Sequence, residues 1–390
     1  MPLPGQLNPP PRLLLGPGPS DVHPRVLTAM ATPLLGHLDP FFLTLMNETR
    51  EMLQQAFRTR NALTFPVSAT GMAGMETCLV NLLEPGDKIV ICVNGFFGQR
   101  MLDVAARTGA RVTELAVPWG NVFDLDALRD ALKATRPKVL AIVQAETSTG
   151  AWQPIEQIGK LCHEFGTLLL VDAVTALGCV PLEVDGWEID AVYSCTQKGL
   201  SCPPGLSPVS FSPRAVEAIG KRKTKVQSWY LDMTLVQRYW GDDRFYHHTA
   251  PITMIYALRE GLRLLLEEGL EARWQRHMLN HRAIKAGLTA LGLAYSAAEG
   301  HQLPQLNAVK IPAGVDDLTV RKQLLAEFGI EIGGGLGDFK GKVWRIGVMG
   351  HNSRPNCVLV VLAALEKCLV AQGHKAPAGA GVAAANRVYG

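Results

Sequence analysis

Short apolar runs alternate with amphipathic stretches over the first half of the chain. The apolar runs predict strands at residues 88–93, 111–117, 138–144, 167–171 and 191–195. Apolar positions at helical spacing predict helices at residues 41–57, 68–83, 97–108, 124–134 and 154–165. Strands that alternate with helices favour right-handed βαβ units and a mostly parallel sheet sandwiched by helices. The pattern therefore predicts an α/β fold with a large first domain.

The pattern changes after about residue 251. Two long helical stretches, residues 251–268 and 271–291, precede short apolar runs at 306–311 and 343–348 and a helix near 317–328. We expect an N-terminal arm at 1–20, a large domain at 21–250, a smaller α+β C-terminal domain at 251–372 and a loose, Ala- and Gly-rich tail at 373–390.

The overall composition narrows the range of partners. A chain of 390 residues is too long for one ordinary core, which agrees with two domains. Its net charge of +3 gives no reason to expect nucleic acid or an anionic membrane as a partner, and no apolar run is long enough to span a bilayer. The eight cysteines form no CxxC pair, so we expect neither zinc nor disulfides, and a cytoplasmic location.

Candidate chemistry lies at the strand ends, where ligands bind in parallel sheets. Lys198 follows the 191–195 run, where partial desolvation would make its amine a Schiff-base nucleophile; an ordinary surface lysine is the alternative. Asp172 ends another run and is either a capping residue or a functional carboxylate. Residues 68–72 begin a helix that either binds a phosphate or carries a plain N-cap. The loop 146–150 supplies either ligand contacts or turn chemistry.

These parts fit pyridoxal phosphate, which needs a lysine for its aldehyde, a carboxylate for its ring nitrogen and a helix N-terminus for its phosphate. Phe97 would lie on the ring or belong to the core. Arg345 would bind a substrate carboxylate or form a structural salt bridge. A dinucleotide fits less well, because residues 333–337 lack the G-x-G-x-x-G spacing. His247 and His248 are adjacent and point different ways, so we expect no metal site.

Nine short segments occur in the order found in one known family. They are Gly16–Ser20, Thr59–Asn61, Leu83–Asp87, Asn94–Arg100, Glu146–Gly150, Leu168–Asp172, Gln197–Lys198, Tyr246–Thr249 and Arg345–Gly347. On these segments the chain resembles the class V (fold type I) pyridoxal-phosphate aminotransferases. The likeness is greatest to the alanine–glyoxylate and serine–pyruvate aminotransferase group and extends to about residue 369.

The resemblance implies a role for each matching residue. Lys198 would be the Schiff-base lysine, Asp172 the partner of the ring nitrogen, and Arg345 the carboxylate-binding arginine. The remaining implied cofactor contacts are Thr70, Gly71, Met72, Phe97, Thr147, Val174, Gln197, Tyr246 and Thr249. Thr147 and Gly36 would also line the substrate side.

Two positions differ from the family pattern, and two others imply a partner subunit. Phe97 stands where family members often carry tryptophan, which should weaken stacking on the ring. Met72 stands where close relatives have histidine, and its role is open. Tyr246 and Thr249 would reach the phosphate of a partner subunit, which implies a homodimer with shared active sites.

The implied activity is ping-pong amino transfer through Lys198, from a small amino acid (alanine or serine) to a small 2-oxo acid (glyoxylate or pyruvate). One alternative on the same fold is a transaminase for ureidoglycine or hydroxykynurenine. Another is a cysteine desulfurase, for which Cys195 or Cys202 would have to be reactive. A binding protein that kept the fold and lost the chemistry is the remote alternative.

Overall fold

A seven-stranded sheet forms the centre of the molecule. The computed structural model describes residue 1 and residues 3–241 and 243–390. The strand order is β2 (Leu63–Val67), β10 (Ser207–Phe211), β9 (Ala191–Tyr193), β8 (Leu168–Asp172), β5 (Val139–Val143), β3 (Lys88–Val93) and β4 (Arg111–Ala116). Neighbours from β9 to β4 are parallel, whereas β10 runs antiparallel to both β2 and β9. The α/β class with a mostly parallel sheet is confirmed; β10 was not predicted.

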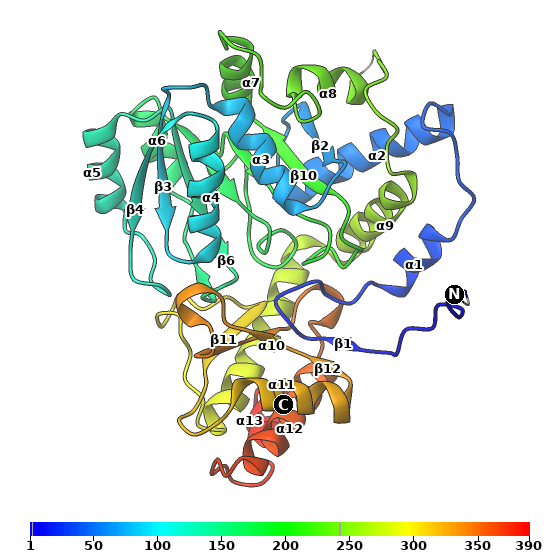
Figure 1. The fold of residues 1–390 in the computed structure, drawn as a ribbon, viewed down its shortest axis with the longest axis vertical. Coiled ribbons are helices and arrows are strands. Elements are labelled where there is room, and N and C mark those ends of the chain that lie inside the picture. The colour runs from blue at the N-terminus through cyan, green and yellow to red at the C-terminus, as the bar shows by residue number, and fades with distance from the viewer. Residues whose placement is uncertain (2, 242) are drawn as a thin grey trace.

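Helices surround this sheet in the upper part of Figure 1. They are α1 (Pro24–Met30), α2 (Pro40–Phe57), α3 (Gly71–Leu82), α4 (Phe96–Arg107), α5 (Leu125–Thr135), α6 (Ile158–Glu164), α7 (Pro213–Gly220) and α8 (Met233–Trp240). The inner strands β5 and β8 consist mostly of Val, Ile and Leu and are buried along their whole length, because helices cover the sheet. No helix in the described part of the chain combines the length and the apolar character needed to cross a membrane.

A second, smaller unit lies below the sheet in Figure 1. Its antiparallel sheet has the order β11 (Leu306–Lys310), β14 (Val343–Gly347), β13 (Gly333–Gly334). The helices α10 (Leu270–Ala290), α11 (Asp317–Phe328) and α12 (Pro355–Ala371) belong with it. This α+β unit has its own apolar core, separate from that of the large unit.

The boundary between the two units differs from the predicted one at residue 251. Helix α9 (Ile252–Glu268) packs against α1 and α2 and contributes Ile255, Leu258 and Leu262 to the core of the large unit. The smaller unit therefore begins with α10. An amphipathic helix has an apolar face that could pack on either neighbour, so its periodicity does not reveal the unit to which it belongs.

The tail at 373–390 is not loose, and this prediction was wrong. Residues Ala380–Tyr389 form α13, which packs along α10. Ala384 and Ala385 are buried, and the hydroxyl of Tyr389 donates to Oδ1 of Asn280 at 2.7 Å. An Ala- and Gly-rich composition is common in loose segments, and for that reason it suggests a loose tail. In this protein the small side chains instead allow α13 to pack closely on α10.

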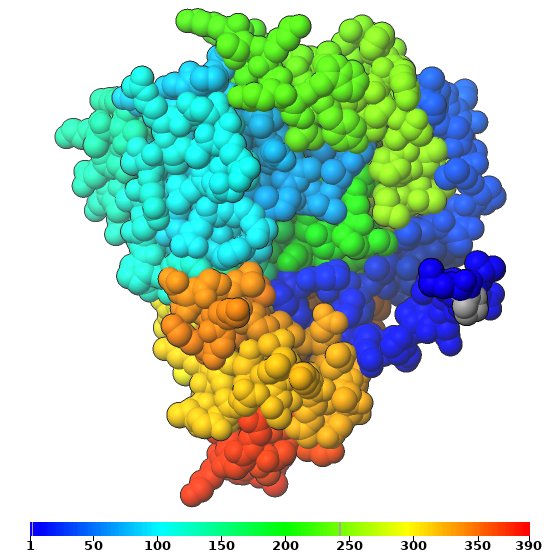
Figure 2. Space-filling model, in the orientation of Figure 1, coloured from blue at the N-terminus to red at the C-terminus, as the bar shows by residue number. Residues whose placement is uncertain are grey.

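The N-terminal arm connects the two units. Leu13–Leu14 (β1) pairs in parallel with Ile330–Glu331 (β12) of the smaller unit, and Leu15 is buried in its core. Five residues further on, the amide of Ser20 donates to the carbonyl oxygen of Gln197 in the large unit at 2.9 Å. Figure 2 shows this part of the chain, in blue, across the junction of the units.

We predict that Ala385→Leu destabilises the protein by about 1–3 kcal/mol, because extra carbon atoms must enter a filled space between α13 and α10. Ala383→Leu, on the exposed face of the same helix, is the matched control and should have almost no effect. Thermal unfolding of both variants measures the difference. Equal unfolding temperatures for the two variants would mean that α13 is not packed in solution.

Candidate active site

Lys198 lies in the loop after β9 with its amine held by the N-terminal arm. The side chain is 9% exposed, and its Nζ donates to the carbonyl oxygen of Pro17. Gly18 has a φ of +111°, and a Cβ at this position would come within 2.6 Å of Nζ, so only glycine fits there. Burial lowers the pKa of the Lys198 amine, and the positive charge of Arg345 acts in the same direction. The result is a fixed amine with increased nucleophilic character.

Asp172 ends β8 directly beside Tyr193, which ends β9. The Tyr193 hydroxyl donates to Oδ2 of Asp172 at 2.7 Å, and the amide of Val174 donates to Oδ1 at 2.8 Å. Burial raises the pKa of Asp172 to about 7 despite these two donors. A cationic group placed against the carboxylate would lower that pKa again. Tyr193 could not be predicted from the sequence, because it completes an apolar strand.

The N-terminus of α3 is open to an anion. Thr70 is the N-cap residue, and its side chain makes no capping hydrogen bond. A Cβ on Gly71 would lie 2.9 Å from Cβ of Cys195 and 3.7 Å from Cγ2 of Val174, so the helix start is packed close to both residues. Within the described chain, Oε1 of Gln197 is buried without a hydrogen-bond partner. Free amides at the end of a helix suit a phosphate group, whereas Oε1 of Gln197 is an acceptor and needs a donor of its own.

Thr147 and Glu146 extend the site toward α4. The hydroxyls of Thr147 and Thr175 lie 2.8 Å apart. Glu146, in the short strand β6 (Ala145–Glu146), accepts hydrogen bonds from the amides of Phe97 (3.1 Å) and Gly98 (3.3 Å), and burial raises its pKa. This carboxylate therefore fixes the backbone that carries Phe97. The sequence did not distinguish Glu146 from its polar loop neighbours.

Arg345 is an unpaired buried cation. It is 7% exposed, and its Nε donates to the carbonyl oxygen of Gly334 at 2.7 Å. Among the described residues no carboxylate lies within 4.0 Å of its guanidinium, so the structural salt bridge is not formed. Burial lowers the pKa of Arg345 to about 10, and it stays charged at neutral pH. Gly333 beside it is in close contact with Pro17, whose carbonyl oxygen also binds Lys198.

Four predicted residues lie apart from this cluster or at its edge. Sδ of Met72 lies 3.7 Å from a guanidinium nitrogen of Arg100. Tyr246 and Thr249 are exposed with their hydroxyls 3.4 Å apart, and Gly36 is exposed with open space around it. In this single chain none of the last three makes a hydrogen bond to Lys198, Asp172 or Gln197 within the described residues.

The histidines between Tyr246 and Thr249 form a hydrogen-bonded chain. The Nδ1 atoms of His247 and His248 lie 2.8 Å apart, and Nε2 of His248 lies 2.7 Å from the hydroxyl of Ser68. The described residues contain no group of three or more side chains able to hold a metal ion.

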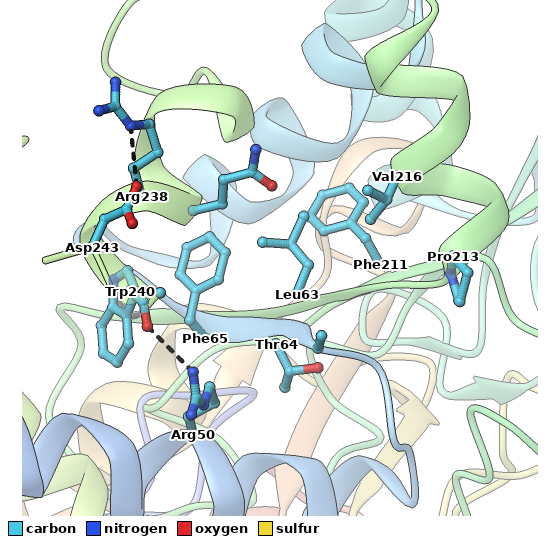
Figure 3. A pocket seen from close by; sticks show the side chains of 13 residues that line it. Arg50, Leu63, Thr64, Phe65, Phe211, Pro213, Val216, Arg238, Trp240 and Asp243 are labelled. Carbon is cyan, nitrogen blue, oxygen red and sulfur yellow. Dashed lines mark hydrogen bonds and ion pairs between the residues drawn. The ribbon is translucent and has the colours of Figure 1, made fainter. Parts of the chain in front are cut away.

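A cavity of about 650 Å³ lies elsewhere, beside the edge strand β2 (Figure 3). Phe65 and Trp240, which stack with ring centroids 5.7 Å apart, line it together with Leu63 and Phe211. It contains none of the predicted site residues. The chemistry of the buried ionisable groups, not this cavity, locates the candidate active site.

The thiols do not fit a desulfurase. All eight cysteines are free and buried. Burial raises the pKa of both Cys195 and Cys202 to about 12, which suppresses the thiolate that such chemistry requires.

Comparison with known proteins agrees with this chemistry. The family model for class-V aminotransferases matches residues 15–338. The crystal structure of alanine–glyoxylate aminotransferase from Nostoc sp. superposes with a TM-score of 0.93 and 53% identity, covering 94% of this chain and 97% of that one. The ureidoglycine–glyoxylate aminotransferase of Bacillus subtilis gives a TM-score of 0.97 and 42% identity over 99% of this chain and 100% of that one.

An animal enzyme is also similar to this chain over most of its length. Alanine–glyoxylate aminotransferase of Callithrix jacchus is 42% identical over 367 residues, which are 93% of this chain and 89% of the relative. A match of this extent, together with a buried lysine, a strand-end aspartate and an unpaired arginine, leaves one assignment: the chain belongs to the class-V aminotransferase family.

Proposed function

We propose that the protein transfers the amino group of alanine or serine to glyoxylate, using pyridoxal phosphate. The observation that carries this function is the placement of Lys198, Asp172 and the open N-terminus of α3 around one end of the sheet, with Arg345 brought in by the arm. Relatives named for transfer to glyoxylate support the choice of acceptor.

The residues present fit the cofactor. Lys198 supplies the amine for its aldehyde, Asp172 the carboxylate for its ring nitrogen, and the α3 terminus with Thr70, Gly71 and the backbone N–H of Gln197 the cradle for its phosphate. When bound, pyridoxal phosphate supplies an electron-withdrawing ring that stabilises negative charge at the Cα of an amino acid. The pKa of Asp172 is raised because its carboxylate is buried without an ion-pair partner among the described residues, and a protonated ring nitrogen would supply one.

The protein's own residues orient the substrate and move its proton. Arg345 has guanidinium nitrogens without a carboxylate partner and binds the substrate carboxylate bidentately. Nζ of Lys198 takes the proton from the substrate's Cα, because its lowered pKa increases the share of neutral amine near pH 7. Tyr193 and Val174 hold the Asp172 carboxylate in one orientation throughout.

We further propose a homodimer. A cluster of large apolar side chains on the surface supports it: Leu34, Phe41, Trp229, Phe245 and Tyr246 are 40% or more exposed, with Phe41 at 64% and Trp229 at 61%. The rings of His37 and Tyr246 are 5.2 Å apart, and those of Trp229 and His247 are 4.4 Å apart, so the segments that carry these residues are neighbours. Large apolar side chains exposed on neighbouring segments of a surface are typical of protein–protein interfaces. Tyr246 and Thr249 would then reach the partner's phosphate cradle.

We also propose a cytoplasmic location, which the eight free cysteines support, since oxidising compartments favour paired cysteines.

Ureidoglycine is the second candidate donor. The full-length likeness to the Bacillus subtilis enzyme favours it. Ureidoglycine, like alanine and serine, presents a carboxylate to Arg345. These donors differ only in the group attached to Cα. The structure offers no specific observation for hydroxykynurenine.

A half-reaction assay tests the proposed function. We expect the cofactor-loaded protein to convert alanine or serine to its oxo acid without an acceptor, and then to convert glyoxylate to glycine. Lys198→Ala should slow the first step by at least about a thousandfold, because it removes both the nucleophile and the base. Lys221→Ala, an exposed lysine paired with Glu217, is the control. Turnover of ureidoglycine at least about tenfold faster than alanine would select the second candidate, and no turnover of any donor would refute the function.

We predict that Arg345→Gln lowers kcat/KM for the amino donor by roughly 10- to 100-fold, because a charge-assisted bidentate contact is lost. Arg345→Lys should recover only part of this loss, since it restores the charge without the planar fork. Steady-state kinetics over a range of donor concentrations measure the effect. Arg60→Gln, at a nearly fully exposed position, is the control, and an unchanged kcat/KM in Arg345→Gln would exclude carboxylate binding there.

We predict that the cofactor-free protein loses stability between about pH 4 and pH 7 through Asp172. Its folded-state pKa of about 7 lies above the ordinary value of 3.8, so the stabilising neutral form is complete below pH 4 and is lost as the pH rises toward 7. The loss is at most about 4 kcal/mol. Unfolding curves across this range should show a smaller loss for Asp172→Asn than for the wild type. The exposed control Asp103→Asn should follow the wild type, and parallel curves for all three proteins would contradict the prediction.

A further inference from the structure

A second cavity, of about 470 Å³, lies next to the loop that carries Lys198. Its wall includes Leu200 and Ser201 from that loop, His23 at the start of α1, and His351 in the short 3-10 helix η2 (Gly350–Asn352). Ser201 connects these segments: its hydroxyl accepts from the amide of His351 at 2.7 Å, and its carbonyl oxygen accepts from the amide of His23 at 3.1 Å. The arm, the lysine loop and the smaller unit therefore meet at this cavity.

The carboxylates in the wall are already neutralised. Glu268 pairs with Arg273 at 2.8 Å and with Arg276 at 2.5 Å. Glu267 pairs with Arg25 and Arg263, neither of which lines the cavity, at 2.7 and 2.9 Å. No wall carboxylate is thus left to balance another positive charge.

Arg354 is the lining cation that remains. Among the described residues no carboxylate lies within 4.0 Å of it, and its Nε is buried without a hydrogen-bond partner. Its one side-chain contact is a weak one, from Nη2 to Sγ of Cys357 at 3.8 Å. A charged donor without an acceptor is costly when removed from water, so an acceptor that enters the cavity would be bound favourably.

His23 adds a neutral donor to the same wall. Its Nδ1 accepts from the amide of Arg25 at 3.1 Å, so the neutral ring carries its proton on Nε2. The ring of His351 packs edge-on against it with centroids 4.6 Å apart. Burial, reinforced by nearby arginines, lowers the pKa of both rings, that of His351 to about 4. Near neutral pH both rings are therefore uncharged, and Arg354 is the charged group of the wall that forms no ion pair among the described residues; the carboxylate of Asp21, outside the wall, acts on the His351 ring without pairing with Arg354.

We propose that this cavity is a binding site for a small oxyanion, a carboxylate or a phosphate, held by the guanidinium of Arg354 and Nε2–H of His23. The site is separate from the proposed active site and does not depend on the proposed function. An occupant joins the arm to the smaller unit. It also lies beside Arg273, whose guanidinium donates to the carbonyl oxygen of Gly199, the neighbour of Lys198, at 2.5 Å. The bound anion therefore stabilises the arrangement of the arm around the lysine loop.

Calorimetric titration of the cofactor-loaded protein with inorganic phosphate, and separately with acetate, tests the site at constant ionic strength. We expect saturable binding of at least one anion, and the pair identifies whether a tetrahedral or a planar oxyanion is preferred. Arg354→Gln should weaken it at least about tenfold, because a charged hydrogen bond is lost. His23→Asn should also weaken binding while its side-chain oxygen preserves the cap of α1.

Arg60→Gln is the matched control and should bind as the wild type does, since its side chain is 98% exposed and does not line the cavity. Arg354→Gln should also keep the transaminase activity of the wild type within about twofold in the absence of the anion, which shows that the variant is folded. Absence of saturable binding of either anion to the wild type would overturn the proposal. Binding that survives unchanged in folded Arg354→Gln would also overturn it, because the anion would then occupy another site such as that at Arg345.

Discussion

The contact between the Lys198 amine and the carbonyl oxygen of Pro17 holds the proposed active site together. The arm that supplies this carbonyl is fixed on one side by pairing with β12 and on the other by the bond from Ser20 to Gln197. The same Pro17 packs against Gly333, next to Arg345. One short segment therefore sets the distance between the lysine that reacts and the arginine that binds. Glycine at 18 is required because any side chain would occupy the position of the amine.

Buried ionisable groups that form no ion pair with another described residue are the second common feature. Lys198, Asp172 and Arg345 all have pKa values displaced by burial, each toward the neutral form. A folded protein keeps such groups at a cost in stability, and they are retained where a ligand supplies the opposite charge. The three groups call for an aldehyde, a cationic ring nitrogen and a carboxylate. The chemistry of the ligand can thus be derived from the charges that the chain leaves unbalanced.

The sequence predicted those parts of the fold and site that depend on local pattern. Buried strands are continuous apolar runs; Asp172 stands out because it ends such a run, and Lys198 because it lies in the polar turn shortly after another one. Tyr193 and Glu146 could not be found in this way. Tyr193 has the β-propensity of its neighbours, and its role depends on the register of β8 with β9; Glu146 acts on α4, some fifty positions earlier. The assignment of α9 to the large unit and the packing of α13 likewise depend on tertiary contacts that local composition does not encode.

The identity of the amino donor is a problem of the same kind, and the arrangement of the single chain explains why. Arg345 recognises a carboxylate that alanine, serine and ureidoglycine all carry, so it cannot discriminate among them. Discrimination requires contacts beyond Cα, and one candidate for them, Gly36, is exposed in one chain and adjoins His37, whose ring packs on Tyr246 of the apolar surface. In the proposed homodimer a second copy covers that surface and completes the pocket. Donor specificity then belongs to the interface, where substitutions that leave Lys198, Asp172 and Arg345 unchanged can still alter the substrate.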